Sequence, residues 1–136
     1  MKSALVVVGS ALLLAACDRG DLADRGRLVG PTWTLRELQQ SQAAGAAVPP
    51  GDAFRARFDD TGRLSVAADC NSCGGGFEAA DGRLRVGALA CTRVYCVATA
   101  PLDTEYVAQL EAAQSYAVDT RTLTIRTGRG VLVFAR

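Results

Sequence analysis

The chain has 136 residues, of which 15 are Lys or Arg, 14 are Asp or Glu and none is His. Lys2 is its single lysine, so the rest of the chain balances 15 − 1 = 14 basic residues against 14 acidic ones and offers no basic face for nucleic acid. His is the usual general base and metal ligand, and Lys forms Schiff bases. The composition therefore excludes most hydrolase, metalloenzyme and aldolase mechanisms, and we expect no catalytic residue, metal or cofactor.

The N-terminal segment predicts export. Residues 1–16 carry one charge, at Lys2, followed by an apolar run from Ala4 to Ala16 that is interrupted only at residues 9 and 10. A membrane-spanning helix needs about 20 apolar residues, so this shorter run is typical of a signal peptide.

The signal ends in Leu14-Ala15-Ala16-Cys17, which resembles the lipobox of bacterial lipoproteins. In that motif the small residues fit a peptidase subsite and the Cys thiol accepts a diacylglyceryl group. We expect Cys17 to be lipidated and to anchor the protein to a membrane of the cell envelope, facing the periplasm. Asp18 resembles a signal for retention in the inner membrane, although the choice between inner and outer membrane stays open.

The mature chain has 136 − 16 = 120 residues, which is the length of one domain. Residues 17–30 are polar and interrupted by glycines, and we expect them to form a flexible tether. The alternative is an N-terminal arm docked on the domain that spans residues 31–136.

The first half of this domain predicts strands. Residues 32–38 fit a half-buried strand, and residues 39–52 fit a loop. Residues 53–58 and 63–68 alternate apolar with charged or polar residues around a turn at 59–62, which predicts a β-hairpin.

A second hairpin is predicted from residues 76–80 and 83–87 around Asp81-Gly82, a strong turn signal. Residues 101–114 change to a helical period, with Leu102, Tyr106 and Leu110 on one face. The period of two then returns in residues 115–119, 121–127 and 131–135. The fold class is therefore mainly β: an antiparallel barrel-like domain of about eight strands, with one helix before the last three.

Four cysteines remain after Cys17, and an even number in an exported chain indicates disulfides. A turn between residues 81 and 82 pairs residues whose numbers sum to about 163. Cys73 and Cys91 sum to 164, and Cys70 and Cys96 sum to 166. The hairpin therefore favours two nested bonds, Cys70–Cys96 and Cys73–Cys91, over the crossed pairing or a Cys70–Cys73 bridge.

Three other interpretations of this region are weaker. Cys70-Asn71-Ser72-Cys73 has the C-x-x-C spacing of thiol oxidoreductases, but Gly74–Gly76 and a strand follow it instead of a helix. The spacing of the four cysteines also matches zinc ribbons poorly. A phosphate-binding loop at Gly74–Gly76 would lack its helix and its Lys, so the glycines are better explained as backbone room.

The domain also carries an ordered set of motifs. They are Trp33-x-Leu35, Cys70-Asn71-x-Cys73-x-Gly75-x-Phe77, Leu89-Ala90-Cys91-Thr92-Arg93-x-x-Cys96, Leu102-Asp103-x-x-Tyr106-x-x-x-Leu110, Leu123-x-Ile125 and Leu132-x-Phe134. Together they resemble the META domain family, which includes the heat-shock lipoprotein HslJ, over about residues 31–136. The resemblance implies a compact antiparallel barrel-like domain without agreed catalytic residues, and links to heat shock, novobiocin tolerance and, in protozoa, virulence. By this resemblance, Cys70 and Cys96 occupy the positions where the family usually has cysteines, and Cys73 and Cys91 look like the extra pair of a four-cysteine subgroup.

The main functional hypothesis is a non-enzymatic envelope lipoprotein that acts by binding an envelope protein or lipid, in stress tolerance or envelope maintenance. A second hypothesis is a pilotin-like module that holds an acyl chain or a secretion partner, which an open groove lined by Leu102, Tyr106 and Leu110 would favour. A closed barrel filled by side chains would count against it.

Two further hypotheses use other residues. One is inhibition of a hydrolase such as lysozyme through the loop at residues 39–52. The other is an enzyme that uses Asp69 or Asp103, although isolated carboxylates usually face solvent or cap a helix.

Overall fold

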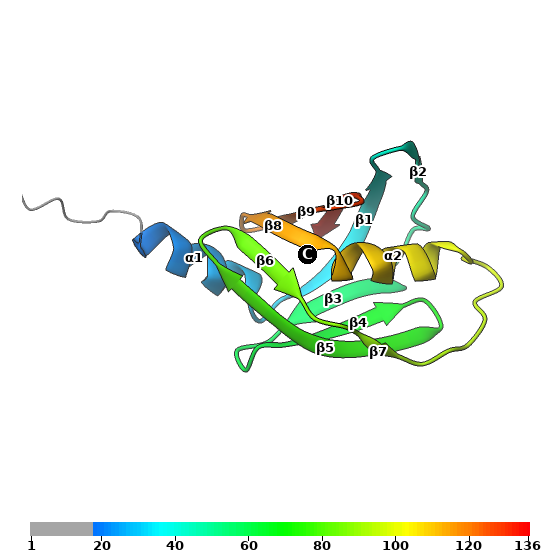
Figure 1. Cartoon of the computed structure of the whole chain (residues 1–136), viewed down its shortest axis with the longest axis horizontal. Coiled ribbons are helices and arrows are strands. Elements are labelled where there is room, and N and C mark those ends of the chain that lie inside the picture. The colour runs from blue at the N-terminus through cyan, green and yellow to red at the C-terminus, as the bar shows by residue number, and fades with distance from the viewer. Residues whose placement is uncertain (1–17) are drawn as a thin grey trace, which may run out of the picture.

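The computed structural model describes residues 18–136, and the predicted signal peptide and Cys17 lie outside the described residues. The elements follow one another along the chain as shown in Figure 1. They are α1 (Asp18–Leu28), β1 (Thr32–Gln40), β2 (Ala43–Ala46), β3 (Phe54–Phe58), β4 (Arg63–Ala68), β5 (Asn71–Ala80), β6 (Arg83–Val86), β7 (Ala90–Cys91), α2 (Leu102–Glu111), β8 (Ala113–Val118), β9 (Thr122–Thr127) and β10 (Gly130–Ala135). No helix within residues 18–136 has the length and apolar character needed to cross a bilayer.

Eight antiparallel strands form a closed barrel in the order β10-β9-β8-β6-β5-β4-β3-β1, and β1 pairs with β10 to close it. Strands β2 and β7 are short additions that pair with β1 and β5. The predicted fold class is confirmed, including the single helix before the last three strands. The closure is uneven, because β1 and β10 share six residue pairs whereas β6 and β8 share only Arg83 and Ser115.

Both predicted hairpins are present. Residues 54–58 pair with 64–68 in β3 and β4 without a register shift. In the second hairpin, Asp81 and Gly82 have φ values of 53° and 71°, as a type I′ turn requires. Strand β9 also alternates as expected, with Leu123, Ile125 and Thr127 buried.

Two segments differ from the expected pattern. The predicted loop at residues 39–52 contains β2, which its Ala-rich sequence does not signal, because alanine is depleted in strands. Strand β5 begins at Asn71 and not at residue 76, so Gly74–Gly76 lie within a strand. A Cβ on Gly75 would come within 2.8 Å of the Ala88 carbonyl oxygen, so this glycine makes room for the chain that follows β6.

Helix α2 closes one end of the barrel through its buried face. Tyr106 is fully buried and packs edge-on against Phe54, with ring centroids 5.6 Å apart. Burial raises the pKa of the Tyr106 phenol far above its usual value. Buried Gln109 donates a hydrogen bond to the Gln39 carbonyl of β1 at 3.0 Å and accepts one from the Thr127 hydroxyl of β9 at 3.2 Å. These bonds fix the rotation of α2 and decide which of its faces remains outside.

The prediction of a flexible tether is wrong for residues 18–28, which form α1. Leu28 at its end is fully buried, and its carbonyl accepts a hydrogen bond from the Trp33 indole at 3.0 Å. Nearer the start of α1, Asp21 accepts a hydrogen bond from the backbone N–H of Asp81. The helix has no apolar stripe that a sequence pattern could reveal, so these contacts with the barrel define it. In Figure 1, α1 lies at one end of the molecule and the segment between β7 and α2 at the other.

Candidate binding groove beside the paired disulfides

Two disulfides fasten the segment after β6 to strand β5. Cys73 in β5 is bonded to Cys91 in β7, and their Cα atoms lie 4.0 Å apart. Cys70 is bonded to Cys96, with Cα atoms 5.7 Å apart. This is the nested pairing that the hairpin geometry favours. Because each cysteine of the C-x-x-C motif has a distant partner, the motif is not a redox pair of neighbouring thiols.

Asn71, between the two cysteines, holds the backbone of the facing segment. Its amide nitrogen donates to the Val94 carbonyl at 2.9 Å, and its amide oxygen accepts from the Val94 N–H at 2.8 Å. The same oxygen accepts a bond from the Thr92 hydroxyl at 3.0 Å, and that hydroxyl accepts one from the Ser72 N–H at 3.0 Å. A buried side chain therefore acts as a strand partner for residues 92–94.

Residues 92–97, which we call the disulfide loop, combine a fixed backbone with exposed apolar side chains. Val94 is 57% exposed, Tyr95 is 76% exposed and Val97 is 83% exposed. Within the described chain only Leu22 is another exposed large apolar residue. Large apolar side chains that cluster on a surface mark interaction sites more often than scattered ones do. A fixed loop also loses little conformational entropy when a partner binds.

A groove of about 680 Å³ separates the disulfide loop from α2. One wall is made by Thr92–Tyr95. The other is made by Asp103, Val107 and Glu111, which are spaced four residues apart along the side of α2 that lines the groove. The Cys73–Cys91 bond lies in its floor. Drug-sized ligands occupy pockets of about 300–1,000 Å³, so this groove, the α2 groove, can hold a few residues of a peptide.

Asp103 is the most unusual residue of the α2 groove. It is only 6% exposed, and its Oδ1 atom is buried without a hydrogen-bond partner among residues 18–136. Asp103 lies in the first turn of α2, where the helix dipole favours a negative charge. At the other end of the groove, Glu111 accepts a hydrogen bond from the Leu89 N–H at 2.7 Å.

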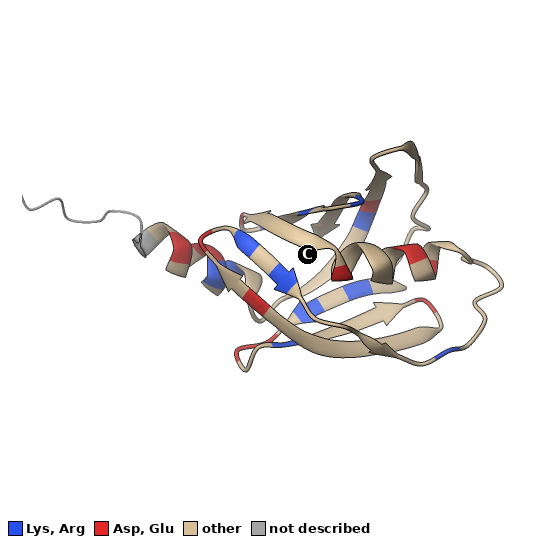
Figure 2. Ribbon diagram, in the orientation of Figure 1, with Lys and Arg blue, Asp and Glu red and all other residues tan. Residues whose placement is uncertain are grey.

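The charges around the groove are mostly acidic. Figure 2 shows acidic residues at both ends of α2 and basic colouring on the segment after β7. Arg93 accounts for that basic colouring, as the one charged residue between Thr92 and Pro101. Glu105 is engaged elsewhere: its carboxylate pairs with Arg129 at 2.7 Å, and this contact holds its pKa below the usual value.

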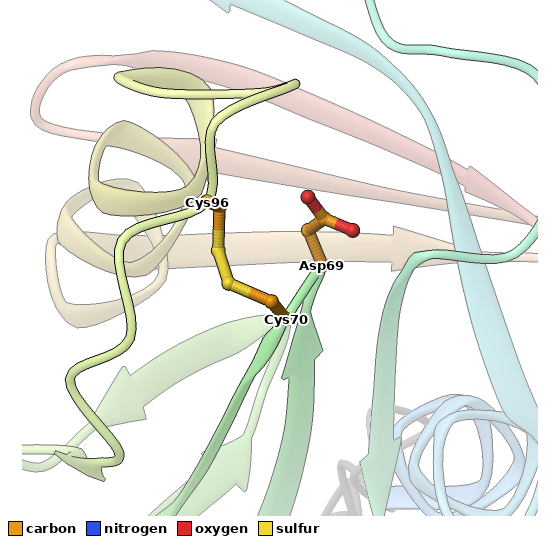
Figure 3. A group of neighbouring side chains, drawn as sticks. All are labelled: Asp69, Cys70 and Cys96. Atoms are coloured by element: carbon orange, nitrogen blue, oxygen red, sulfur yellow. A yellow bond between two sulfur atoms is a disulfide. The ribbon is translucent and has the colours of Figure 1, made fainter.

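Figure 3 shows Asp69 beside the disulfide between Cys70 and Cys96. The carboxylate and the two sulfur atoms lie within 4.8 Å of one another. Both sulfurs belong to one disulfide, so neither is a thiolate that could bind a metal. The Asp69 carboxylate accepts a hydrogen bond from the Thr99 hydroxyl at 2.7 Å. This group is therefore a structural link between the end of β4 and the approach to α2.

The remaining site predictions have mixed outcomes. Cys17 lies outside the described residues, so its lipidation stays a prediction. Leu102, Tyr106 and Leu110 are all buried in the core, so among the described residues they do not line the open groove that would have favoured the pilotin-like hypothesis. The disulfide loop was not predicted as a binding surface, although the run of uncharged residues after Arg93 can be seen in the sequence.

The comparisons with known proteins agree with this architecture. The model of the META domain family matches residues 26–136. No curated protein sequence matches the chain. An NMR structure of a protein from Burkholderia xenovorans is similar at a TM-score of 0.69 and 22% identity, covering 98% of each chain. A crystal structure of a DUF4847-family protein from Bacteroides vulgatus is similar at a TM-score of 0.59 and 14% identity, covering 79% of this chain and 93% of that one. The identities are too low to carry more than the fold, whereas the family match spans the whole barrel: this chain belongs to the META domain family.

Proposed function

We propose that this META-domain protein is a non-enzymatic lipoprotein of the bacterial cell envelope, anchored through Cys17, which acts in stress tolerance or envelope maintenance by binding a partner at the disulfide loop. The observation that carries the proposal is the fixed loop with Val94, Tyr95 and Val97 exposed. Aromatic side chains on a rigid backbone are typical anchors of binding surfaces.

The absence of His from the sequence supports a binding role over catalysis. Of the two carboxylates that catalysis could have used, Asp69 bonds to the Thr99 hydroxyl and Asp103 lies in the first turn of α2. The signal-like residues 1–16 and the Leu-Ala-Ala-Cys motif support export and anchoring. Asp18 favours the inner membrane as the site of the anchor.

The pilotin-like alternative is disfavoured, since the face of α2 that it requires as the wall of an acyl groove is part of the core. Inhibition of a hydrolase through residues 39–52 is also less well supported. Part of that loop is paired with β1, and it presents no exposed large apolar side chain.

Photo-crosslinking in living cells tests the proposal. A photoreactive amino acid at position 95 should crosslink to a small set of envelope proteins, and the same group at position 60, in the β3–β4 turn, should not. Each crosslinked protein is then purified and its binding to the wild-type chain is measured. Equal crosslinking from both positions, or none from position 95, would refute binding through the loop.

The anchor is tested separately. Cys17→Ser should move the protein from the membrane fraction to the soluble fraction and leave its melting temperature unchanged. If the variant stays with the membrane, the lipidation hypothesis fails, whereas the crosslinking result stands on its own.

A further inference from the structure

We propose that the occupant of the α2 groove is an extended segment of a partner protein in which an Arg or Lys is flanked by apolar residues, with the cation placed against Asp103. This inference rests on the proposed function and names the chemistry of the partner.

The first step concerns the burial and the unsatisfied hydrogen bonding of Asp103. Asp103 is only 6% exposed and lines the groove. Its Oδ1 atom lacks a hydrogen-bond partner within the described chain. A buried polar atom left without a hydrogen-bond partner destabilises the folded state, and it does so more strongly when it is charged. The helix dipole offsets part of this cost, but it supplies no donor to Oδ1. A ligand that brings a charged donor to the groove side of this carboxylate would offset that cost.

The second step is the sign of the charge around the groove. Asp103 and Glu111 stand at the two ends of the α2 wall, and Arg93 on the opposite wall is exposed. Glu111 Oε1 is already bonded to the Leu89 N–H, which leaves Asp103 as the acidic group still to be paired. At Asp103, charge complementarity therefore selects a cation, and a carboxylate or phosphate placed there would be repelled.

The third step is the apolar surface beside the carboxylate. The Cys73–Cys91 disulfide, Leu89 and Val107 line the groove, and Val94 and Tyr95 continue this surface outward. Val97, further along the same loop, is also exposed. A small free cation would leave this surface uncovered, whereas apolar residues on each side of an Arg or Lys would cover it. The exposed Tyr95 ring can also stack on a guanidinium group.

The position of the groove favours a protein segment over the anchoring bilayer. The disulfide loop lies at the end of the molecule opposite α1, and α1 directly follows the proposed anchor (Figure 1). Insertion of Val94, Tyr95 and Val97 into the same membrane would require the molecule to lie down on it. The anchoring membrane therefore becomes an outcome to test and not the favoured partner.

Fluorescence polarisation with defined peptides tests the inference. The full chain is purified from the envelope in phospholipid nanodiscs, and empty nanodiscs report binding to lipid alone. The probes are three labelled, end-blocked peptides of the form Val-Leu-X-Leu-Val, with Arg, Gln or Glu at X. We expect the Arg peptide to bind at least about tenfold more tightly than the Gln peptide, as expected for a hydrogen bond to a charged group. The Glu peptide should bind most weakly.

Asp103→Asn keeps the shape of the side chain and removes its charge. It should reduce the preference for Arg over Gln to less than about twofold, with little change in the affinity for the Gln peptide. Asp60→Asn, which removes one charge from the distant β3–β4 turn, should keep the full preference. If Asp103→Asn fails to fold, as judged by its melting temperature, raising the salt concentration on the wild-type chain must selectively weaken the Arg peptide.

The inference is overturned if the three peptides bind alike, if none binds at millimolar concentration, if binding equals that of empty nanodiscs, or if Asp103→Asn retains the preference. These failures are distinct from failure of the proposed function. Crosslinking from position 95 reports contact at the loop whatever the charge of the partner.

Discussion

Replacing Asn71 by Ala should lower the free energy of unfolding by about 2 kcal/mol. The side chain makes three hydrogen bonds to oxygen and nitrogen atoms, two with the Val94 backbone and one with the Thr92 hydroxyl, besides weaker contacts of its amide nitrogen to the two sulfur atoms of the neighbouring disulfide. Each contributes about 1 kcal/mol in proteins, and hydration of the freed Val94 groups on this exposed loop recovers part of the sum. With an unfolding entropy of about 2.1 cal/mol/K per residue over the barrel, the loss corresponds to a melting temperature lower by roughly 9 °C.

Urea unfolding measured by tryptophan fluorescence is a direct assay, because Trp33 is the single tryptophan and is fully buried. The control is Ser72→Ala, since the Ser72 side chain is exposed and the segment is held by its backbone N–H. The control should change stability by less than about 0.5 kcal/mol. A loss below about 0.5 kcal/mol for Asn71→Ala, or equal losses for both variants, would show that the loop does not depend on this side chain.

Three further predictions concern stability. Replacing Cys70 and Cys96 together by Ser should cost about 2–4 kcal/mol in urea unfolding, and thiol reduction of the wild type should lower its melting temperature; an unchanged midpoint would contradict a structural role for the bonds. The folded-state pKa of Glu105 lies below its usual 4.5, so its contribution is complete above that value and is lost as the pH falls through the folded pKa. An acid titration should therefore destabilise the wild type more than Glu105→Gln, by at most about 1 kcal/mol, and identical curves would exclude the effect. Gly130→Ala should destabilise by about 1–3 kcal/mol because its Cβ would clash with the backbone of β1, whereas Gly128→Ala meets mainly a flexible side chain and should be tolerated.

The barrel was predictable where local chemistry determines structure. The Asp81-Gly82 turn sets the register of its hairpin, and a shift of one residue between β6 and β7 then places Cys73 opposite Cys91. The period of 3.6 residues likewise identified the face of α2 that carries Tyr106 and Leu110. In these segments each residue's preference agrees with its final environment.

The remaining elements depend on contacts between distant segments. Helix α1 has a polar sequence, and it is defined by the hydrogen bond from the Trp33 indole to the Leu28 carbonyl and by the bond from the β5–β6 turn to Asp21. The bonds from Asn71 to Val94 join residues 23 apart in the sequence, and no periodicity reports them. The α2 groove was not predicted for the same reason. Residues on one side of a helix line a groove only when another segment of the chain packs opposite them.

The uneven closure of the barrel has a consequence for ligand binding. Strands β6 and β8 share one residue pair, so strand pairing in the barrel is weakest between these two strands. The chain leaves the barrel after β6 for the disulfide loop and returns through α2 to β8. The loop is bonded to Cys70, just before β5, and hydrogen-bonded to Asn71 at its start, and Gln109 joins α2 to β1 and β9. An occupant of the groove would contact both the loop and α2, and would therefore stabilise the weakly paired strands β6 and β8. Ligand binding should slow amide hydrogen exchange at Arg83 and Ser115 more than elsewhere, so that binding in the groove would change the local stability of the barrel.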